Sequence, residues 1–254
     1  MDVHLHNDLI EKNYKLWKRK PLLRIVYHDL YQTMSRHLSQ VSGKTVELGS
    51  GMGSLREVLP ECILTDLFPY PWIDQVENAY RLSFENETIA NLLMVDVFHH
   101  FRYPGNALKE FQRVLNAGGR VIMMEPALSV LGYIVYGLFH AEPIGRAKAI
   151  TWFAPAEWDA NQIDYYAAQG NATRIFVEKF FEKNLADWKI IKVERIAALA
   201  YAASGGYSGP QLYPTFAYRF MKWTEKLLQF FPSLFATRLL IVLEKKASAD
   251  AFKN

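Results

Sequence analysis

The amino-acid sequence predicts an α/β fold built on a mostly parallel β-sheet, and three observations support this prediction. Apolar runs of strand length recur along the first half of the chain, at residues 44–48, 62–65 and 91–97. The first run ends at closely spaced glycines, which is typical of a buried strand that turns sharply into a helix. Helical spacing of apolar residues precedes the first run at 8–38 and follows the third run after Pro104.

Composition narrows the class of protein. The chain has 254 residues, 50% of them hydrophobic and 22% charged, which suits one soluble domain with a substantial core. With 29 basic and 26 acidic side chains, a nucleic-acid partner has little electrostatic support. The single cysteine, Cys62, indicates a reducing compartment. The N-terminal residues lack the apolar core of a secretory signal, and the longest uncharged run, 127–140, is too short to span a bilayer. We therefore expect a cytoplasmic protein without integral membrane association.

The glycine turn at 49–53 is the strongest local signal for a ligand site. Gly49, Gly51 and Gly53 permit positive φ and let a ligand lie directly on the main chain. We expect a helix at 54–59, whose first N–H groups could bind a polar group. A dinucleotide site would need its third glycine where Ser54 stands. A plain strand-to-helix turn without a ligand is the alternative.

The next two strands supply further polar candidates. Asp66 follows the run 62–65 and could accept hydrogen bonds from both hydroxyls of a ribose, or could be a surface carboxylate. Two prolines at 69 and 71 exclude a full crossover helix, so this edge of the sheet should be abbreviated. A third strand at 73–77 then leads to Asn78.

Adjacent histidines follow the strand at 91–97. On extended backbone His99 and His100 would point to opposite sides, and no third ligand lies at useful spacing, so we predict no metal site. Either ring could serve as a general base, because histidine titrates near neutral pH. Packing for one ring and helix capping for the other is an equally good interpretation. A helix from Pro104 ends at 116–119, and a strand follows at 120–124.

These motifs, read in order as VELGSGMG, TDL, LSF, NLLMVDVFHHF and ALKEFQRVLNAGGRVIMMEP, resemble the class I S-adenosylmethionine-dependent methyltransferase family. Over residues 44–126 the chain is similar to type 11 methyltransferases, including the ubiquinone and menaquinone biosynthesis enzymes. The resemblance implies a seven-stranded, doubly wound sheet closed by an antiparallel hairpin, for which the strands predicted at 188–196 and 237–244 are suitable. It also implies S-adenosyl-L-methionine as the cofactor.

The resemblance also assigns residues to the site. The cofactor-binding residues that it implies are Glu47, Gly49, Ser50, Gly51, Gly53, Asp66, Asn78, Ala79, Val95 and Asp96. Asn78 stands where the family often has an aspartate that accepts from the adenine amino group, and an amide oxygen could do the same. The catalytic candidates are His100, His99 and Asp96. We favour His100 because the chain there leaves the sheet toward the expected acceptor.

The rest of the chain completes a single predicted domain, 1–254, in which residues 174–185 are expected to form a helix. Residues 1–43 form lead-in helices, 44–126 the cofactor-binding half, and 127–172 and 197–236 two cap insertions, of which 151–162 would be a lid. The second insertion carries an aromatic stripe at helical spacing, which could be core, an acceptor pocket or an interfacial helix. Its members are Phe216, Phe220, Trp223, Leu227, Phe230 and Phe231.

We therefore predict a methyltransferase acting on a small, partly apolar or aromatic acceptor. The alternatives are a non-catalytic relative that binds S-adenosylmethionine, and an oxidoreductase using NAD or a nucleotide sugar.

Overall fold

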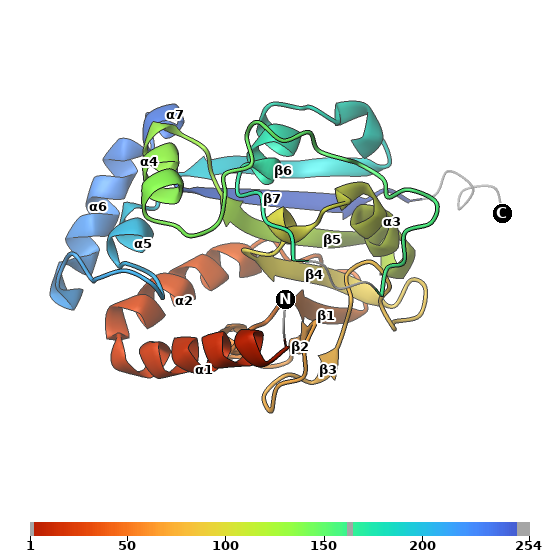
Figure 1. Cartoon of the computed structure of the whole chain (residues 1–254), viewed down its shortest axis with the longest axis horizontal. Coiled ribbons are helices and arrows are strands. Elements are labelled where there is room, and N and C mark those ends of the chain that lie inside the picture. The colour runs from red at the N-terminus through yellow and green to blue at the C-terminus, as the bar shows by residue number, and fades with distance from the viewer. Residues whose placement is uncertain (1–2, 162–164, 248–254) are drawn as a thin grey trace.

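A computed structural model describes residues 3–161 and 165–247, with side chains from residue 8 onward, and shows a seven-stranded sheet in the order β3-β2-β1-β4-β5-β7-β6 (Figure 1). The strands are β1 (Lys44–Leu48), β2 (Ile63–Asp66), β3 (Gln75–Val76), β4 (Ile89–Val95), β5 (Leu115–Pro126), β6 (Trp188–Ile196) and β7 (Arg238–Lys245). Strands β1 to β5 pair in parallel, whereas β7 runs antiparallel to both β5 and β6. The predicted α/β class and the seven strands are confirmed, and the sheet is mixed.

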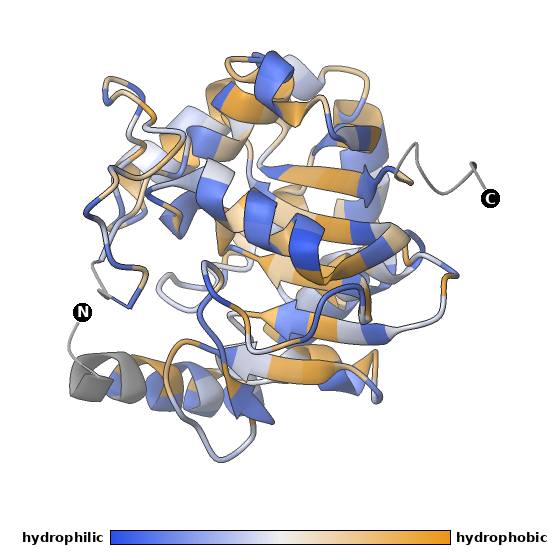
Figure 2. Ribbon diagram, turned by 90° about the vertical axis from the view of Figure 1, so that its right-hand side faces the viewer, coloured by the Kyte–Doolittle hydropathy of each residue, from blue (hydrophilic) through white to orange (hydrophobic). Residues whose placement is uncertain are grey.

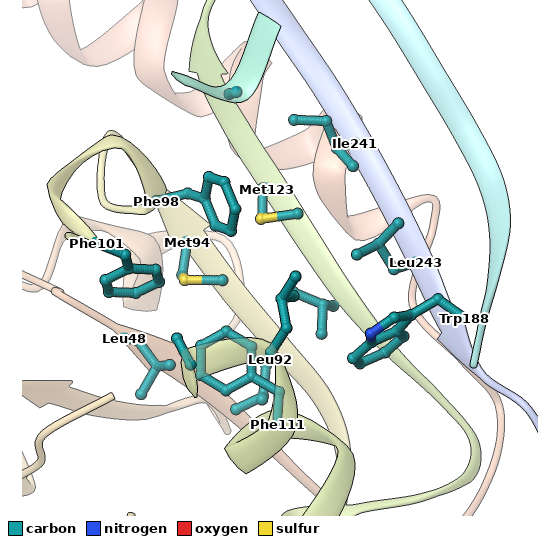
Figure 3. Packing of buried hydrophobic residues seen from close by; sticks show 14 of the residues in the cluster. Leu48, Leu92, Met94, Phe98, Phe101, Phe111, Met123, Trp188, Ile241 and Leu243 are labelled. Atoms are coloured by element: carbon teal, nitrogen blue, oxygen red, sulfur yellow. The ribbon is translucent and has the colours of Figure 1, made fainter. Parts of the chain in front are cut away.

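Helices cover both faces of the sheet. They are α1 (Val3–Arg19), α2 (Pro21–Ser35), α3 (Pro104–Val114), α4 (Val130–Leu138), α5 (Leu199–Ala203), α6 (Tyr218–Leu228) and α7 (Pro232–Phe235). Aromatic and aliphatic residues of α2 pack on one face, against β4, β5 and β7. The side chains of α3 pack on the other, in the cluster of Figure 3 that holds Phe111, Leu92 and Trp188. Most strand residues near the middle of the sheet are hydrophobic (Figure 2).

Two predicted helices are wrong. Residues 54–59 form only a 3-10 turn, Ser54–Glu57, because Pro60 prevents the chain just before it from continuing a helix. The predicted helix at 174–185 is instead a π turn, Thr173–Val177, and a 3-10 turn, Glu182–Leu185. Lys179 lies between these turns with a φ of +61°, which breaks helical geometry.

The helices that follow β5 lie at one end of the sheet (Figure 1). In Figure 1, α4 to α7 gather beyond the ends of β4 and β5, on the side where these parallel strands terminate. The edge strand β3 has two residues, as the prolines before it led us to expect. Among the described residues, the helices are all too short or too polar to cross a membrane.

Candidate functional site

A cavity of about 790 Å³ opens at the carboxyl ends of β1, β2 and β4. The strand order reverses between β1 and β4, and ligands in open α/β sheets bind at such a switch point. Ten of the residues assigned from the sequence line this cavity: Glu47, Gly49, Ser50, Gly51, Asp66, Asn78, Ala79, Val95, Asp96 and His100. The chain therefore brings together residues that are up to 53 positions apart in sequence, from Glu47 to His100.

The glycine turn forms one wall of the cavity. Gly49 has a φ of +70°, and a Cβ there would lie 2.5 Å from a methyl group of Val97. Gly51 has a φ of +52° and lines the cavity with bare backbone. Gly53 also has a positive φ but faces Leu64 and Trp72 and is outside the lining. Gly53 shapes the turn, Gly49 makes room for Val97, and Gly51 offers a close approach to a ligand.

Glu47 is the buried carboxylate beside this turn. Its side chain is 3% exposed, and its Oε2 atom has no hydrogen-bond partner among the described residues. Burial raises the pKa of Glu47 to about 8. An unpartnered acid that lines a cavity is satisfied best by a ligand with a cationic or hydrogen-bond-donating group.

Asp66 ends β2 on the same wall. Its Oδ2 atom accepts a hydrogen bond of 2.8 Å from the Gly51 N–H, which ties the second strand to the glycine turn. Ser50 adds a second tie, since its hydroxyl accepts from the Thr65 N–H at 3.0 Å. These two hydrogen bonds fix the position of the Asp66 carboxylate relative to the glycine turn.

Asn78 has a structural role that the sequence did not indicate. Its amide nitrogen donates to the Ala160 carbonyl at 2.6 Å, and its Oδ1 atom accepts from the Tyr80 N–H at 3.0 Å. The loop predicted as a lid is also anchored by Trp158, whose ring lies 5.0 Å from that of Tyr80. Its last residue, Gln162, lies outside the described residues. Asn78 thus fastens this loop over the cavity, and adenine recognition by it stays a prediction.

Helix α1 covers the glycine turn, which the sequence interpretation missed. Leu9, Ile10 and Asn13 line the cavity from this helix. Tyr14 stacks on Trp72 with ring centroids 5.2 Å apart, and the Trp72 indole N–H donates to the Gly51 carbonyl at 2.8 Å. A stacked aromatic contact of this kind stabilises the packing of α1 on the loop between β2 and β3.

Asp96 follows β4 in a left-handed conformation, with a φ of +58°. Its carboxylate accepts a hydrogen bond of 2.6 Å from Arg238, whose side chain is fully buried. Arg238 also donates to the Met124 carbonyl at 3.1 Å. The ion pair neutralises the buried guanidinium. Asp96 is therefore better suited to a structural role, linking the end of β4 to Arg238 at the start of β7, than to accepting a proton.

The two histidines do not point to opposite sides, and that prediction is wrong. The residues Phe98–His100 form a 3-10 turn rather than extended backbone, and the rings of His99 and His100 lie 4.2 Å apart. A third group is also present: Glu142, from the segment after α4, has ligand atoms within 4.8 Å of those of both histidines. Sequence spacing gave no signal for Glu142.

His99 lies between two carboxylates. Its Nδ1 atom is 2.7 Å from Glu125 and its Nε2 atom 3.2 Å from Glu142. Burial alone would lower the pKa of His99, but the two carboxylates outweigh burial and raise this pKa to about 10. The ring is therefore protonated at neutral pH and has no lone pair to accept a substrate proton.

His100 has the opposite environment. Burial and the neighbouring His99 charge lower its pKa, so the ring is neutral at neutral pH. Its Nδ1 atom lies 2.8 Å from the Tyr166 carbonyl, which can only accept, so Nδ1 carries the hydrogen. The lone pair is then on Nε2, 3.6 Å from the Glu142 carboxylate. His100 lines the cavity, so this neutral nitrogen can receive a proton there.

Aromatic rings close the remaining walls. They come from α2, the loops after α4 and the turn after α5: Tyr27, Tyr31, Tyr165, Tyr166 and Tyr207. None of the six aromatic-stripe residues, all of them described, lines the cavity. The interpretation of that stripe as a pocket wall is wrong.

Comparison with known proteins agrees with this geometry. Residues 46–123 match a family model described as a methyltransferase domain. No curated protein sequence is significantly similar to the chain. One solved structure of the same fold is a chain in the complex between the Haloferax volcanii Trm112 methyltransferase activator and a methyltransferase, at 14% identity and a TM-score of 0.52, covering 93% of this chain and 95% of that one.

A second solved structure, from Thermotoga maritima, is described as a SAM-dependent methyltransferase. It is 17% identical with a TM-score of 0.51, and the alignment covers 94% of this chain and 99% of that chain. Residues 46–123 are therefore similar to a methyltransferase domain, and the whole chain has the fold of a solved S-adenosylmethionine-dependent methyltransferase. The narrower likeness to ubiquinone and menaquinone enzymes stays a prediction.

The Asp96–Arg238 pair leads to a prediction about stability. We expect Asp96→Asn to lower the free energy of unfolding by about 3–5 kcal/mol, because it leaves a buried guanidinium uncompensated. Arg238→Met should cost less, since its apolar chain fills similar space and Asp96 is partly exposed. The double variant should lose less than the sum of the two. Urea denaturation measures all three, and additive losses would contradict the coupling.

The raised pKa of His99 predicts how stability depends on pH. The folded protein holds a proton that the unfolded chain releases near pH 6.5, so this contribution is complete below about 6.5 and is lost as pH rises toward about 10. Denaturation at a series of pH values should show this decline in the wild type. In His99→Gln the decline should be smaller, and parallel curves for the two proteins would show that His99 is not protonated.

Proposed function

We propose that the protein transfers a methyl group from S-adenosyl-L-methionine to a small, partly apolar or aromatic acceptor, and that His100 removes a proton from this acceptor. One observation carries the proposal. The glycine turn, the carboxyl groups of Glu47 and Asp66 and a neutral imidazole all face one cavity at the switch point of a methyltransferase-like sheet.

The described residues fit the cofactor. The unpartnered Oε2 atom of Glu47 suits an ammonium group, and the bare backbone at Gly51 suits a closely approaching chain. Asp66, held by Gly51, would accept from ribose hydroxyls. When bound, the cofactor supplies an electrophilic methyl group on a sulfonium.

A dinucleotide cofactor fits less well. Ser54 replaces the third glycine, and its hydroxyl is 2.6 Å from that of Tyr31 in the buried interior. The turn after the glycines is a 3-10 segment of four residues, so it lacks the long helix whose dipole would bind a pyrophosphate. These features favour a methyltransferase over an NAD or nucleotide-sugar oxidoreductase.

The chain's own contribution to catalysis would be alignment and proton removal. Holding acceptor and methyl donor in line can supply roughly 7–11 kcal/mol. His100 would take the acceptor's proton on Nε2, and the Glu142 carboxylate at 3.6 Å would then stabilise the imidazolium. The tyrosines around the cavity would exclude water and contact an apolar acceptor.

The cofactor assignment can be tested by thermal unfolding. Saturating S-adenosylmethionine or S-adenosylhomocysteine should stabilise the protein by roughly 2–4 kcal/mol, whereas NAD should not. Asp66→Ala should weaken binding by about 1–3 kcal/mol because charge-assisted hydrogen bonds are lost. The matched control is Asp187→Ala, an exposed aspartate outside the cavity, which should bind normally. A shift with NAD alone would contradict the proposal.

The role of His100 can be tested once labelled cofactor and a metabolite extract have identified the acceptor. His100→Ala should reduce turnover by about 10²–10⁴ with little change in cofactor affinity. Part of the loss should return at high pH, where the acceptor ionises unaided. His37→Ala, which alters a histidine outside the cavity, is the control. Full turnover of His100→Ala at every pH would mean that no base acts there. If the wild type transfers no label to any compound in the extract, a non-catalytic binding protein is favoured.

A further inference from the structure

Exposed apolar side chains gather on the outer surfaces of α4, α6 and α7, and we infer that this surface docks the protein on an anionic membrane. We call it the aromatic surface. It includes Leu138, Phe139, Phe216, Phe220, Trp223 and Phe230, each of which is more than half exposed. Contiguous apolar patches on soluble proteins usually mark an interaction site.

The packing of helix α6 on α2 determines which of its side chains are exposed. Its inner face packs through Tyr218 and Met221 against Leu22 and Val26 of α2. A surface helix with one face buried normally presents polar residues on the other. Here the outward face carries Phe220 and Trp223, which are 64% and 56% exposed and stack on each other with ring centroids 5.9 Å apart.

Helices α4 and α7 extend the same surface. The Ser129 hydroxyl, at the start of α4, donates to the Leu234 carbonyl of α7 at 3.1 Å and joins the two helices. Leu138 and Phe139 at the end of α4 are each 75% exposed, and Phe230 between α6 and α7 is 78% exposed. Figure 1 shows α4, α6 and α7 together at one end of the molecule. The aromatic surface therefore spans three helices from two distant parts of the chain.

The charges around these rings favour lipid as the occupant. Residues 127–139 and 210–237 contain three cations, Arg219, Lys222 and Lys226, and one acid, Glu225. Glu225 is 6% exposed, and Lys222 is paired with both Glu225 and Asp29 of α2. The exposed cations Arg219 and Lys226 therefore carry the solvent-facing charge of these segments. Phenylalanine and tryptophan beside exposed basic residues are the composition of helices that lie in a membrane interface. The exposed charge of these two described segments is thus complementary to an anionic lipid surface.

The aromatic surface also borders the cavity. The chain leaves α4 through Phe139 and reaches Glu142, a cavity residue, three positions later. A membrane in contact with α4 would therefore lie near the residues that surround the site. The docking inference does not depend on the proposed reaction, because it rests on the exposed residues of α4, α6 and α7 alone.

Vesicle flotation of the full chain tests this inference. The wild type should float with vesicles of phosphatidylglycerol and phosphatidylcholine, and more weakly with pure phosphatidylcholine. The double variant Phe220→Ser, Trp223→Ser should bind at least about tenfold more weakly, because two rings no longer enter the interface. Arg219→Gln and Lys226→Gln should each reduce binding to the anionic vesicles about fivefold and leave binding to neutral vesicles unchanged.

The matched control is Phe180→Ser, which alters a ring of similar exposure, 55%, outside the aromatic surface, and should float like the wild type. Quenching of tryptophan fluorescence by brominated lipid should be lost in Trp223→Phe, which locates the contact even if the double variant unfolds. No flotation of the wild type would overturn the inference. So would a wild-type dimer, detected by light scattering, that the Phe220→Ser, Trp223→Ser variant dissociates, because the aromatic surface would then be an interface between two copies.

Discussion

The carboxylate of Glu125, fully buried at the end of β5, is the interaction on which the candidate site depends. One oxygen accepts from the N–H groups of Val97 and Phe98 at 2.9 and 2.8 Å. The other accepts from the His99 N–H at 3.3 Å and lies 2.7 Å from its ring. Burial raises the pKa of a carboxyl group, but the His99 charge and the backbone N–H groups lower that of Glu125 on balance. A single buried anion thus fixes the turn from which both histidines project.

Strands β1 and β2 and the glycine turn between them were predictable because their signals are local. A β-branched run, positive-φ glycines and an acid at a strand end each depend on a few neighbouring residues, so β1, β2 and the glycine turn follow from the sequence. The contacts that complete the site are not local. Glu125 lies 26 positions from His99 and Glu142 lies 43, and the approach of α1 to the turn depends on rings at Tyr14 and Trp72. No spacing rule connects such residues before the sheet order is known.

Helical periodicity has a related limit, which α6 illustrates. A stripe at i, i+3 and i+4 tells which residues share a face, but not whether that face points inward. In α6 the aromatic face points outward because Tyr218 and Met221 on the opposite face already fill the contact with α2. Glu225 on this inner side accepts a hydrogen bond of 2.7 Å from the Ala200 N–H. This acid can therefore stay buried while the aromatic face is exposed to solvent.

The adjacent histidines show how one short turn can hold two imidazoles in different protonation states. His99 has a carboxylate at each ring nitrogen and is kept as a cation. That cation, together with burial, keeps His100 neutral. The Tyr166 carbonyl then selects the tautomer with its lone pair on Nε2. Environments that separate the pKa values of neighbouring groups are a general way to assign acid and base roles. By that reasoning His99 positions the turn and sets the charge, and His100 alone is available to accept a proton in the cavity.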